Sequence, residues 1–338
     1  MDTHKSHGTI SCTELIDSPK IRLMKKANVY ESDVTDNLYA LMGTALHHIL
    51  ERANIESVRK RSFIMTAETI IKHAEELKGT NEERSQQLSK VGNYLFSLIP
   101  YFFPEMGERY IFEQTFSIQL KGEHVLSMTF DLYDTQEQTL WDYKFCSTFQ
   151  YLFPESREKW YQQTNVYAYG LDLNGYPVKA IKILAFFRNW SSFELMRNRD
   201  YPKQQILEIS VPLGNPNDPL KRTWQEQVAG FIDKRIDMHI AAENGEVQDC
   251  TGKDRWASSD SWAVMKRGLK RAVKLFVSEP LAQEFVRDNT HIHKGLYIEY
   301  RPGKSRRCEN FCPVSKFCQQ YADEKKRLQE LSEEEAQI

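Results

Sequence analysis

The chain has 338 residues, which exceeds the roughly 100–200 of a usual single domain, so we expect a core with appended segments. Hydrophobic residues make up 41% of the chain, and this fraction excludes wholesale disorder. The net charge of -2 excludes an overall basic excess, so any nucleic acid must be bound by a local patch.

The ends of the chain and its apolar runs indicate the compartment. No apolar run approaches the roughly 20 residues needed to cross a bilayer. The polar start, residues 1–8, lacks the apolar centre of a secretory signal. We therefore expect a cytoplasmic protein with no membrane partner.

The first half of the chain begins with helical patterns. Residues 9–26 form an N-terminal arm, and apolar residues at helical spacing predict a helix over 38–53. A second helical region follows over 67–99, with a break at 79–81. We expect both regions to cover a core.

Strand patterns come next. Aromatic and branched residues predict three strands at 110–120, 125–133 and 139–145, which we expect to form an antiparallel meander. A helix at 158–171 and a strand at 178–190 follow. This order predicts a mixed α/β core.

The remainder of the chain is predicted to be mainly helical. The segment 202–218 is rich in proline and asparagine and marks a surface connection. We therefore predict two domains, 1–200 and 201–338, the second packed on the first. Further helices are predicted at 224–242, at 261–276 and from 319 onward.

Asp142 and Lys144 carry the first chemical signal. Residues two apart on a strand point to one face, and a hairpin could bring Asp131 beside them. Two converging carboxylates suit a hard divalent cation such as Mg²⁺. A lysine beside them can orient or deprotonate a water molecule. The alternative is a set of exposed charges on an edge hairpin.

Two further pairs lie on predicted helices. His47 and Glu51 are one turn apart, so they share a helix face, and histidine is a competent additional metal ligand. Gln163 and Tyr167 share a face in the same way. The alternatives are a structural, hydrogen-bonded histidine and plain helix packing.

The order of these pieces resembles the RecB-type branch of the PD-(D/E)XK nucleases. The matching residues are Gly43 to His47, Asp131, Asp142 to Lys144, and Gln163 to Tyr167. The resemblance implies an α/β fold with a restriction-endonuclease-like mixed sheet core, flanked by helices and followed by a helical C-terminal extension.

The same resemblance implies roles for these residues in phosphodiester hydrolysis. It implies that His47, Asp131 and Asp142 bind Mg²⁺ or Mn²⁺, with the Tyr143 carbonyl as a further candidate ligand. Lys144 would assist the attacking water. Gln163 and Tyr167 would border the site and the DNA backbone. Glu113 and Glu51 are secondary candidates, for which a salt-bridge role is favoured.

Three cysteines are crowded near the C-terminus. Cys308, Cys312 and Cys318 follow the pattern Cys-x3-Cys-Pro-x4-Cys. This resembles the tail of iron-sulfur nucleases of the CRISPR-adaptation and AddB types, which take a fourth cysteine from the N-terminal arm. Here Ser18 stands at the comparable position, and Cys12 lies six residues earlier.

The fourth ligand is therefore open. An iron-sulfur cluster would need Cys12 or another group, whereas zinc would accept three cysteines with His291 or His293. The third alternative is a set of reduced thiols without metal. With metal bound, the site would fix the C-terminal segment to the core.

Basic residues indicate where DNA could bind. A cluster on one side of the predicted helix at 261–276 is a candidate phosphate track, although such faces are often only solvated surface. Its members are Lys266, Arg267, Lys270, Arg271 and Lys274, followed by Arg301, Lys304, Arg306 and Arg307.

The function expected from these observations is that of an exonuclease resecting DNA ends for recombination or repair. The N-terminal arm, with Ile10-Ser11 ahead of Ser18-Pro19, resembles that of RecE-type phage exonucleases. This resemblance implies a bacterial or phage-infected cell, a homo-oligomer and a single-strand annealing protein as partner. The alternatives are an endonuclease with the same site and a non-catalytic DNA-binding or assembly subunit.

Overall fold

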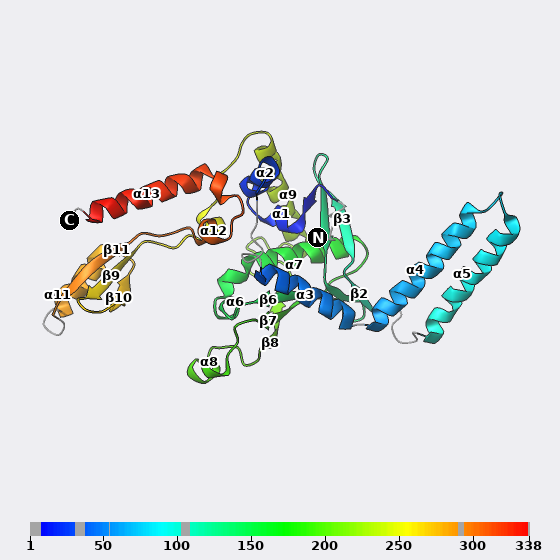
Figure 1. The fold of residues 1–338 in the computed structure, drawn as a ribbon, viewed down its shortest axis with the longest axis horizontal. Helices are drawn as coiled ribbons and strands as arrows, with labels where there is room; N and C mark the ends of the chain where they lie inside the picture. Colours follow the sequence, from blue (N-terminus) through cyan, green and yellow to red (C-terminus); the bar gives the residue numbers. More distant parts are fainter. Residues whose placement is uncertain (1–7, 31–37, 54, 103–108, 290–293, 337–338) are drawn as a thin grey trace. The chain divides into compact units, whose positions relative to one another are not determined.

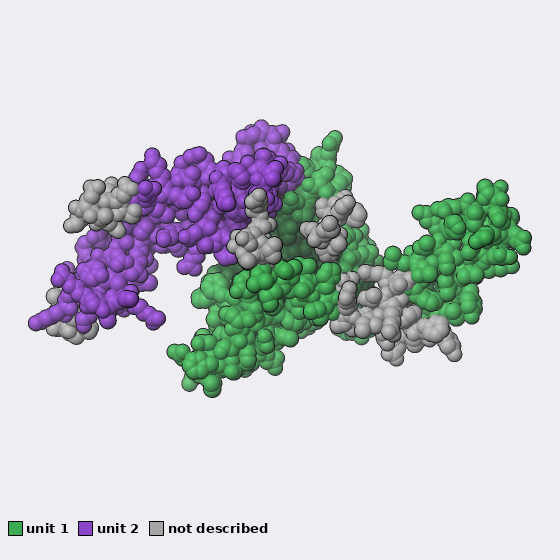
Figure 2. Space-filling view, in the orientation of Figure 1, with its two compact units in different colours: residues 1–16, 37–237 green, residues 17–36, 238–338 purple. Residues whose placement is uncertain are grey.

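The structure is a computed structural model that describes residues 8–30, 38–53, 55–102, 109–289 and 294–336. The chain divides into two compact units, coloured separately in Figure 2. Unit 1 comprises residues 1–16 and 37–237, and unit 2 comprises 17–36 and 238–338. These bounds are not those of the predicted domains, and the division at residue 200 stays a prediction.

A five-stranded sheet forms the centre of unit 1, in the order β2-β5-β6-β7-β8 (Figure 1). Its strands are β2 (Tyr110–Phe112), β5 (Leu132–Asp134), β6 (Thr139–Cys146), β7 (Ala180–Phe187) and β8 (Ile206–Val211). The pair β6 and β7 is parallel, and the other neighbours are antiparallel. The predicted mixed α/β core is thus confirmed.

Helix α7 (Glu158–Leu173), where a helix was predicted over 158–171, makes the crossover between the parallel strands and packs against β6 and β7. Alternate residues of β7, from Ile181 to Phe187, are buried, which is the pattern of a strand with one face on the core. Gly170 lets α7 approach β4, because a Cβ atom there would overlap the Met128 side chain.

A second sheet of unit 1 has the order β1-β4-β3. Its strands are β1 (Ile10–Ser11), β4 (Val125–Thr129) and β3 (Thr115–Gln119). The predicted single meander is therefore wrong, because the segments 110–120 and 125–133 each pass from one sheet to the other. The turn in the first segment is at Glu113, whose φ of 46° interrupts the extended backbone.

Helices account for the rest of unit 1. Helix α3 (Leu38–Ala53) has the predicted bounds, and α4 (Ile55–Glu76) and α5 (Glu82–Phe102) form an antiparallel hairpin. Gly79, with φ of 83°, lies in the predicted break between them. The short α1 (Cys12–Ile16), a 4-residue α6 (Phe149–Leu152), a 3-10 turn η1 (Pro154–Arg157) and α8 (Ser192–Arg197) complete the unit.

Unit 2 combines helices with a small sheet. Its helices are α2 (Pro19–Ala27), α10 (Gly252–Arg255), α11 (Glu279–Asn289), α12 (Arg306–Asn310), a 3-10 turn η2 (Ser315–Phe317) and α13 (Gln319–Ala336). Helix α9 (Trp224–Glu243) crosses the boundary between the units. The helices predicted at 224–242 and from 319 are confirmed.

The helix predicted at 261–276 is wrong. The segment forms β9 (Ser261–Lys266) and β10 (Lys274–Phe276), which pair with β11 (Leu296–Arg301) in the order β10-β9-β11. Gly268, with φ of 87°, lies between the first two strands in a conformation that interrupts a helix. Pairing with the distant β11 supplies backbone hydrogen bonds that helical periodicity cannot reveal.

None of the helices in the described part of the chain is long and apolar enough to cross a bilayer.

Asp134 closes the turn between β5 and β6. Its carboxylate accepts hydrogen bonds from the Arg109 guanidinium, at 2.9 and 3.2 Å, and from the backbone N–H groups of Gln136 and Glu137. Burial alone would raise the pKa of Asp134. The arginine and the two N–H groups lower this pKa by a larger amount, so it lies below its usual range.

We expect Asp134→Ala to lower the free energy of unfolding by about 2 kcal/mol at neutral pH, because several charge-assisted hydrogen bonds are lost. The pKa is lowered in the folded state, so this contribution is present above the unfolded pKa of about 3.9 and is lost as the pH falls below it. Urea unfolding at neutral and acidic pH measures both effects. The exposed Asp200→Ala serves as control, and equal stability of the two variants would contradict the assignment.

Candidate metal-dependent active site

Asp131 lies at the junction between β4 and β5, where the chain passes from one sheet to the other. Its carbonyl accepts a hydrogen bond of 3.2 Å from the N–H of Glu113, at the corresponding junction between β2 and β3. Asp131 is 8% exposed. The two sheet-switching segments therefore hold two carboxylates side by side.

His47 on α3 lies beside both carboxylates. Its Nδ1 is 3.2 Å from Asp131 Oδ1 and 3.9 Å from Glu113 Oε1. Its Nε2 lies 3.2 Å from the carbonyl oxygen of Tyr143. One ligand atom from each of His47, Glu113 and Asp131 lies within 4.8 Å of the others, so the group could hold a metal ion. In the sequence analysis Glu113 was only a secondary candidate, with a salt-bridge role favoured.

The surroundings of His47 favour its protonated form. The hydrogen bond to Asp131 acts most strongly and that to Glu113 next, and together they raise the pKa of His47 to about 10. A metal ion at this group would replace that proton as the positive charge.

Asp142 and Lys144 project from the same side of β6, as the period of two predicts. Lys144 Nζ lies 2.8 Å from Asp142 Oδ2. Asp142 is 2% exposed, and burial, more than any other cause, raises its pKa to about 6. Despite the ion pair, Oδ2 makes no hydrogen bond of acceptable geometry, so a buried anionic oxygen retains lone pairs that a cation could accept.

The backbone between these residues connects them to Asp131. The N–H of Tyr143 donates a hydrogen bond of 2.5 Å to Asp131 Oδ2. The carbonyl of Tyr143 contacts His47, as described above. β6 therefore presents side chains of Asp142 and Lys144 and the backbone of Tyr143 to one locus. The negative charge of Asp131 also contributes to the raised pKa of Asp142.

Helix α7 contributes the pair predicted to share a face. Lys144 Nζ donates to Gln163 Oε1 at 3.0 Å, and Gln163 Nε2 donates to the hydroxyl of Tyr167 at 2.7 Å. Tyr167 is 7% exposed. The chain from Asp142 through Lys144 and Gln163 to Tyr167 fixes the lysine side chain.

Two other residues that were candidate metal ligands, Cys12 and Glu51, are not part of this group among the described side chains. The Cys12 thiol is buried and lies 3.9 Å from the carbonyl of Gln163, inside unit 1. Burial raises the pKa of this thiol. Cys12 was a candidate fourth ligand for the C-terminal cysteines, which belong to unit 2, and that expectation stays a prediction. The side chain of Glu51 lies outside the described residues.

Comparisons with known proteins add little to this geometry. No protein-family model matches the chain, and no curated protein matches it. The chain is similar to the crystal structure of SSO0001, with 10% identity and a TM-score of 0.31, over 71% of this chain and 79% of that one. It is also similar to a "Putative exonuclease" from Eubacterium rectale, with 14% identity and a TM-score of 0.28, over 57% and 68%. Likenesses at this level carry no argument about function.

We expect the ion pair between His47 and Asp131 to make the stability of the metal-free protein depend on pH. Because the folded pKa of His47 is raised to about 10, its stabilising contribution is present below the unfolded pKa of 6.5 and is lost as the pH rises through about 10. In EDTA, the stability difference between wild type and His47→Gln should therefore shrink from neutral pH to about pH 10. Thermal unfolding at several pH values measures this stability difference. A difference that does not change with pH would contradict the ion pair between His47 and Asp131.

Proposed function

We propose that the chain is a metal-dependent deoxyribonuclease that hydrolyses phosphodiester bonds. The observation that carries the proposal is the group of His47, Glu113 and Asp131, whose ligand atoms lie within 4.8 Å of one another, together with the neighbouring pair of Asp142 and Lys144 on β6. Such a group of oxygen and imidazole ligands with an adjacent lysine is suited to binding Mg²⁺ or Mn²⁺ beside a phosphate. The resemblance to the RecB-type PD-(D/E)XK nucleases supports the same proposal.

The residues of the site have different roles in the proposed hydrolysis. A bound Mg²⁺ would polarise the scissile phosphate and lower the pKa of a water molecule. Burial lowers the pKa of Lys144, but Asp142 and Asp131 raise it more, so the lysine is held as an ammonium. We therefore propose that Lys144 orients the attacking water and stabilises negative charge on the phosphate. Gln163, held by Tyr167, fixes the direction of the ammonium.

We propose an exonuclease, as the resemblance to RecE-type enzymes implies, with an endonuclease as the second candidate. The setting that the resemblance implies is the cytoplasm of a bacterial or phage-infected cell. There the protein would resect DNA ends for recombination or repair as a homo-oligomer, together with a single-strand annealing protein.

We expect wild-type protein with Mg²⁺ to degrade linear duplex DNA and to leave closed circular DNA intact. Lys144→Ala should lower the rate by about 100-fold or more, because a group that acts on the reacting water is lost. Lys182→Ala is the matched control, since Lys182 lies on the neighbouring strand β7 and pairs with Glu208. Its rate should equal that of wild type.

The other outcomes decide between the alternatives. Cleavage of circular DNA would replace the exonuclease by an endonuclease with the same site. If neither substrate is degraded with Mg²⁺ or Mn²⁺, the nuclease proposal fails and a DNA-binding or assembly subunit takes its place.

We propose that DNA phosphates also contact the basic turn between β9 and β10. Arg267, Lys270 and Arg271 are exposed there, and no carboxylate pairs with them in the part of the chain that the structure describes. Arg301 and Arg307, also predicted for the track, are instead paired with Glu299 and Asp17. The basic turn is therefore the better candidate.

We expect the double variant Lys270→Glu/Arg271→Glu to weaken binding to linear duplex DNA. The slope of log K against log salt concentration should become shallower by about 2, because each phosphate contact contributes about 0.9. Lys325→Glu/Lys326→Glu on α13 changes the net charge equally and serves as control. An equal effect of both pairs on the slope would show that only total charge matters.

We propose a second metal centre at Cys308, Cys312 and Cys318, with iron-sulfur or zinc as the metal, supported by their spacing. The histidines considered as zinc ligands, His291 and His293, lie outside the described residues.

A further inference from the structure

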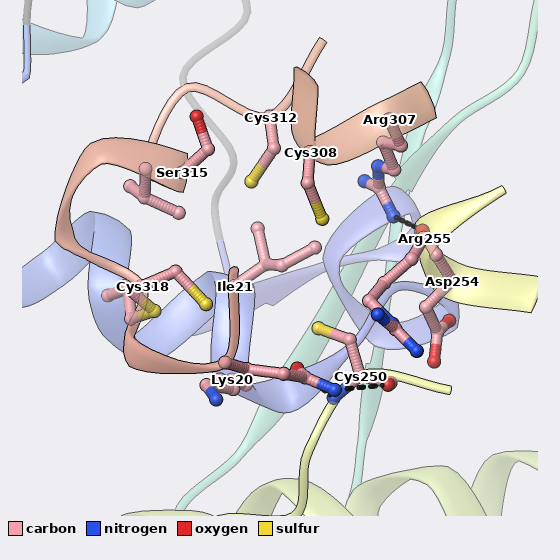
Figure 3. A pocket seen from close by; sticks show the side chains of 13 residues that line it. Lys20, Ile21, Cys250, Asp254, Arg255, Arg307, Cys308, Cys312, Ser315 and Cys318 are labelled. Atoms are coloured by element: carbon pink, nitrogen blue, oxygen red, sulfur yellow. Dashed lines mark hydrogen bonds between the residues drawn. The ribbon is translucent and has the colours of Figure 1, made fainter. Parts of the chain in front are cut away.

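Four cysteines line one cavity of unit 2 (Figure 3). Cys308, Cys312 and Cys318 come from the C-terminal segment, and the fourth is Cys250, which precedes α10. Figure 3 shows their side chains gathered around a common space, close to Ile21 of α2. All are free thiols. The sequence pattern of the C-terminal segment did not indicate Cys250.

The C-terminal segment curls around the cavity through short-range backbone hydrogen bonds. The N–H of Cys312 donates to the carbonyl of Arg307 at 2.8 Å, and that of Cys318 donates to Ser315 at 3.2 Å. The turn η2 lies between the last two cysteines. The three thiols are thus brought together by the local fold of the segment.

Cys250 is held in place from two directions. Its backbone N–H donates to Gln320 Oε1 at 3.1 Å, and Gln320 Nε2 donates to its carbonyl at 2.9 Å. Gln320 is the second residue of α13, the helix that follows Cys318, so these two bonds fix Cys250 close to that cysteine. The Cys250 thiol donates to the buried hydroxyl of Ser18 at 3.3 Å.

Cations of unit 2 surround the thiols. Lys20, Arg255 and Arg307 line the same cavity. Each is bound to a carboxylate, namely Asp249, Glu324 and Asp17 respectively. Four thiolates in one cavity would repel one another. Bringing four thiolates together therefore needs positive charge, which a bound metal supplies.

The spacing of the sulfur atoms distinguishes a cluster from a single ion. Zinc with bonds of about 2.3 Å holds its tetrahedral sulfur ligands within about 4 Å of one another. Among the described residues, no three of the four cysteine sulfurs lie within 4.8 Å of one another. A cluster holds its thiolates farther apart, because several metal atoms lie between them.

We infer that Cys250, Cys308, Cys312 and Cys318 bind an iron-sulfur cluster, with Cys250 as the fourth ligand. This inference rests on the metal centre proposed above for the C-terminal cysteines and is independent of nuclease activity. The cluster would join two sequence-distant segments of unit 2, the one that leads into α10 and the one that leads into α13. Its role is to stabilise this unit.

The direct test is the metal content of the full chain, purified without oxygen. We expect iron and acid-labile sulfide in equal amounts with a visible absorption band, and loss of both in Cys250→Ser. Cys146→Ser is the matched control, because Cys146 is a buried cysteine of unit 1. Zinc without sulfide, no metal in wild type, or full iron content in Cys250→Ser would each overturn the inference.

Two further measurements separate ligation from folding. Because Ser18 Oγ lies 3.3 Å from the Cys250 sulfur, Ser18→Cys added to Cys250→Ser should restore a fourth thiolate and the iron content. In wild type, alkylation followed by mass spectrometry should find Cys250 protected together with the other three cysteines until the iron is chelated. Equal labelling of Cys250 before and after chelation would contradict its assignment as a ligand, whatever the variants do.

Discussion

The electrostatic cost of two buried carboxylates, Asp131 and Asp142, is the constraint on which the site in unit 1 depends. Like charges taken out of water repel each other strongly unless cations lie close by. His47 and Lys144 supply those cations in the described structure, one contacting each carboxylate. A cluster of acids held in this way is poised to accept a divalent metal, because the metal can take over part of the positive charge. The sheets, α3 and α7 position these four side chains.

The cavity of unit 2 is under a similar electrostatic constraint, with different chemistry. Thiols are neutral when protonated, so four of them can line a cavity without charge repulsion, but as thiolates they need a metal and nearby cations. Lys20 and Arg307 lie at the cavity while each remains paired with a carboxylate. Unit 1 thus gathers oxygen ligands suited to a hard cation, and unit 2 gathers sulfur ligands suited to a softer one.

The sequence predicted the features that depend on local periodicity. The period of two placed Asp142 and Lys144 together, and the helical period paired Gln163 with Tyr167. It could not predict features set by distant contacts. Glu113 reaches the metal group through a left-handed backbone turn, which nothing in its residue type signals. Cys250 joins the other cysteines through Gln320, and the segment 261–276 became strands by pairing with β11. The helical expectation failed there because tertiary pairing outweighed local preference.

The central claim is that the carboxylates of unit 1 bind a catalytic divalent metal. The most direct test is a titration with Mn²⁺ in which electron paramagnetic resonance measures how much of the ion is bound. Wild type and Asp131→Asn should be titrated with Mn²⁺ at the same pH, with circular dichroism as the check on folding. The account predicts that the folded variant binds Mn²⁺ at least about tenfold more weakly, a loss of about 1.4 kcal/mol. Equal Mn²⁺ affinity of the two proteins would contradict the account, because Asp131 would then hold no metal.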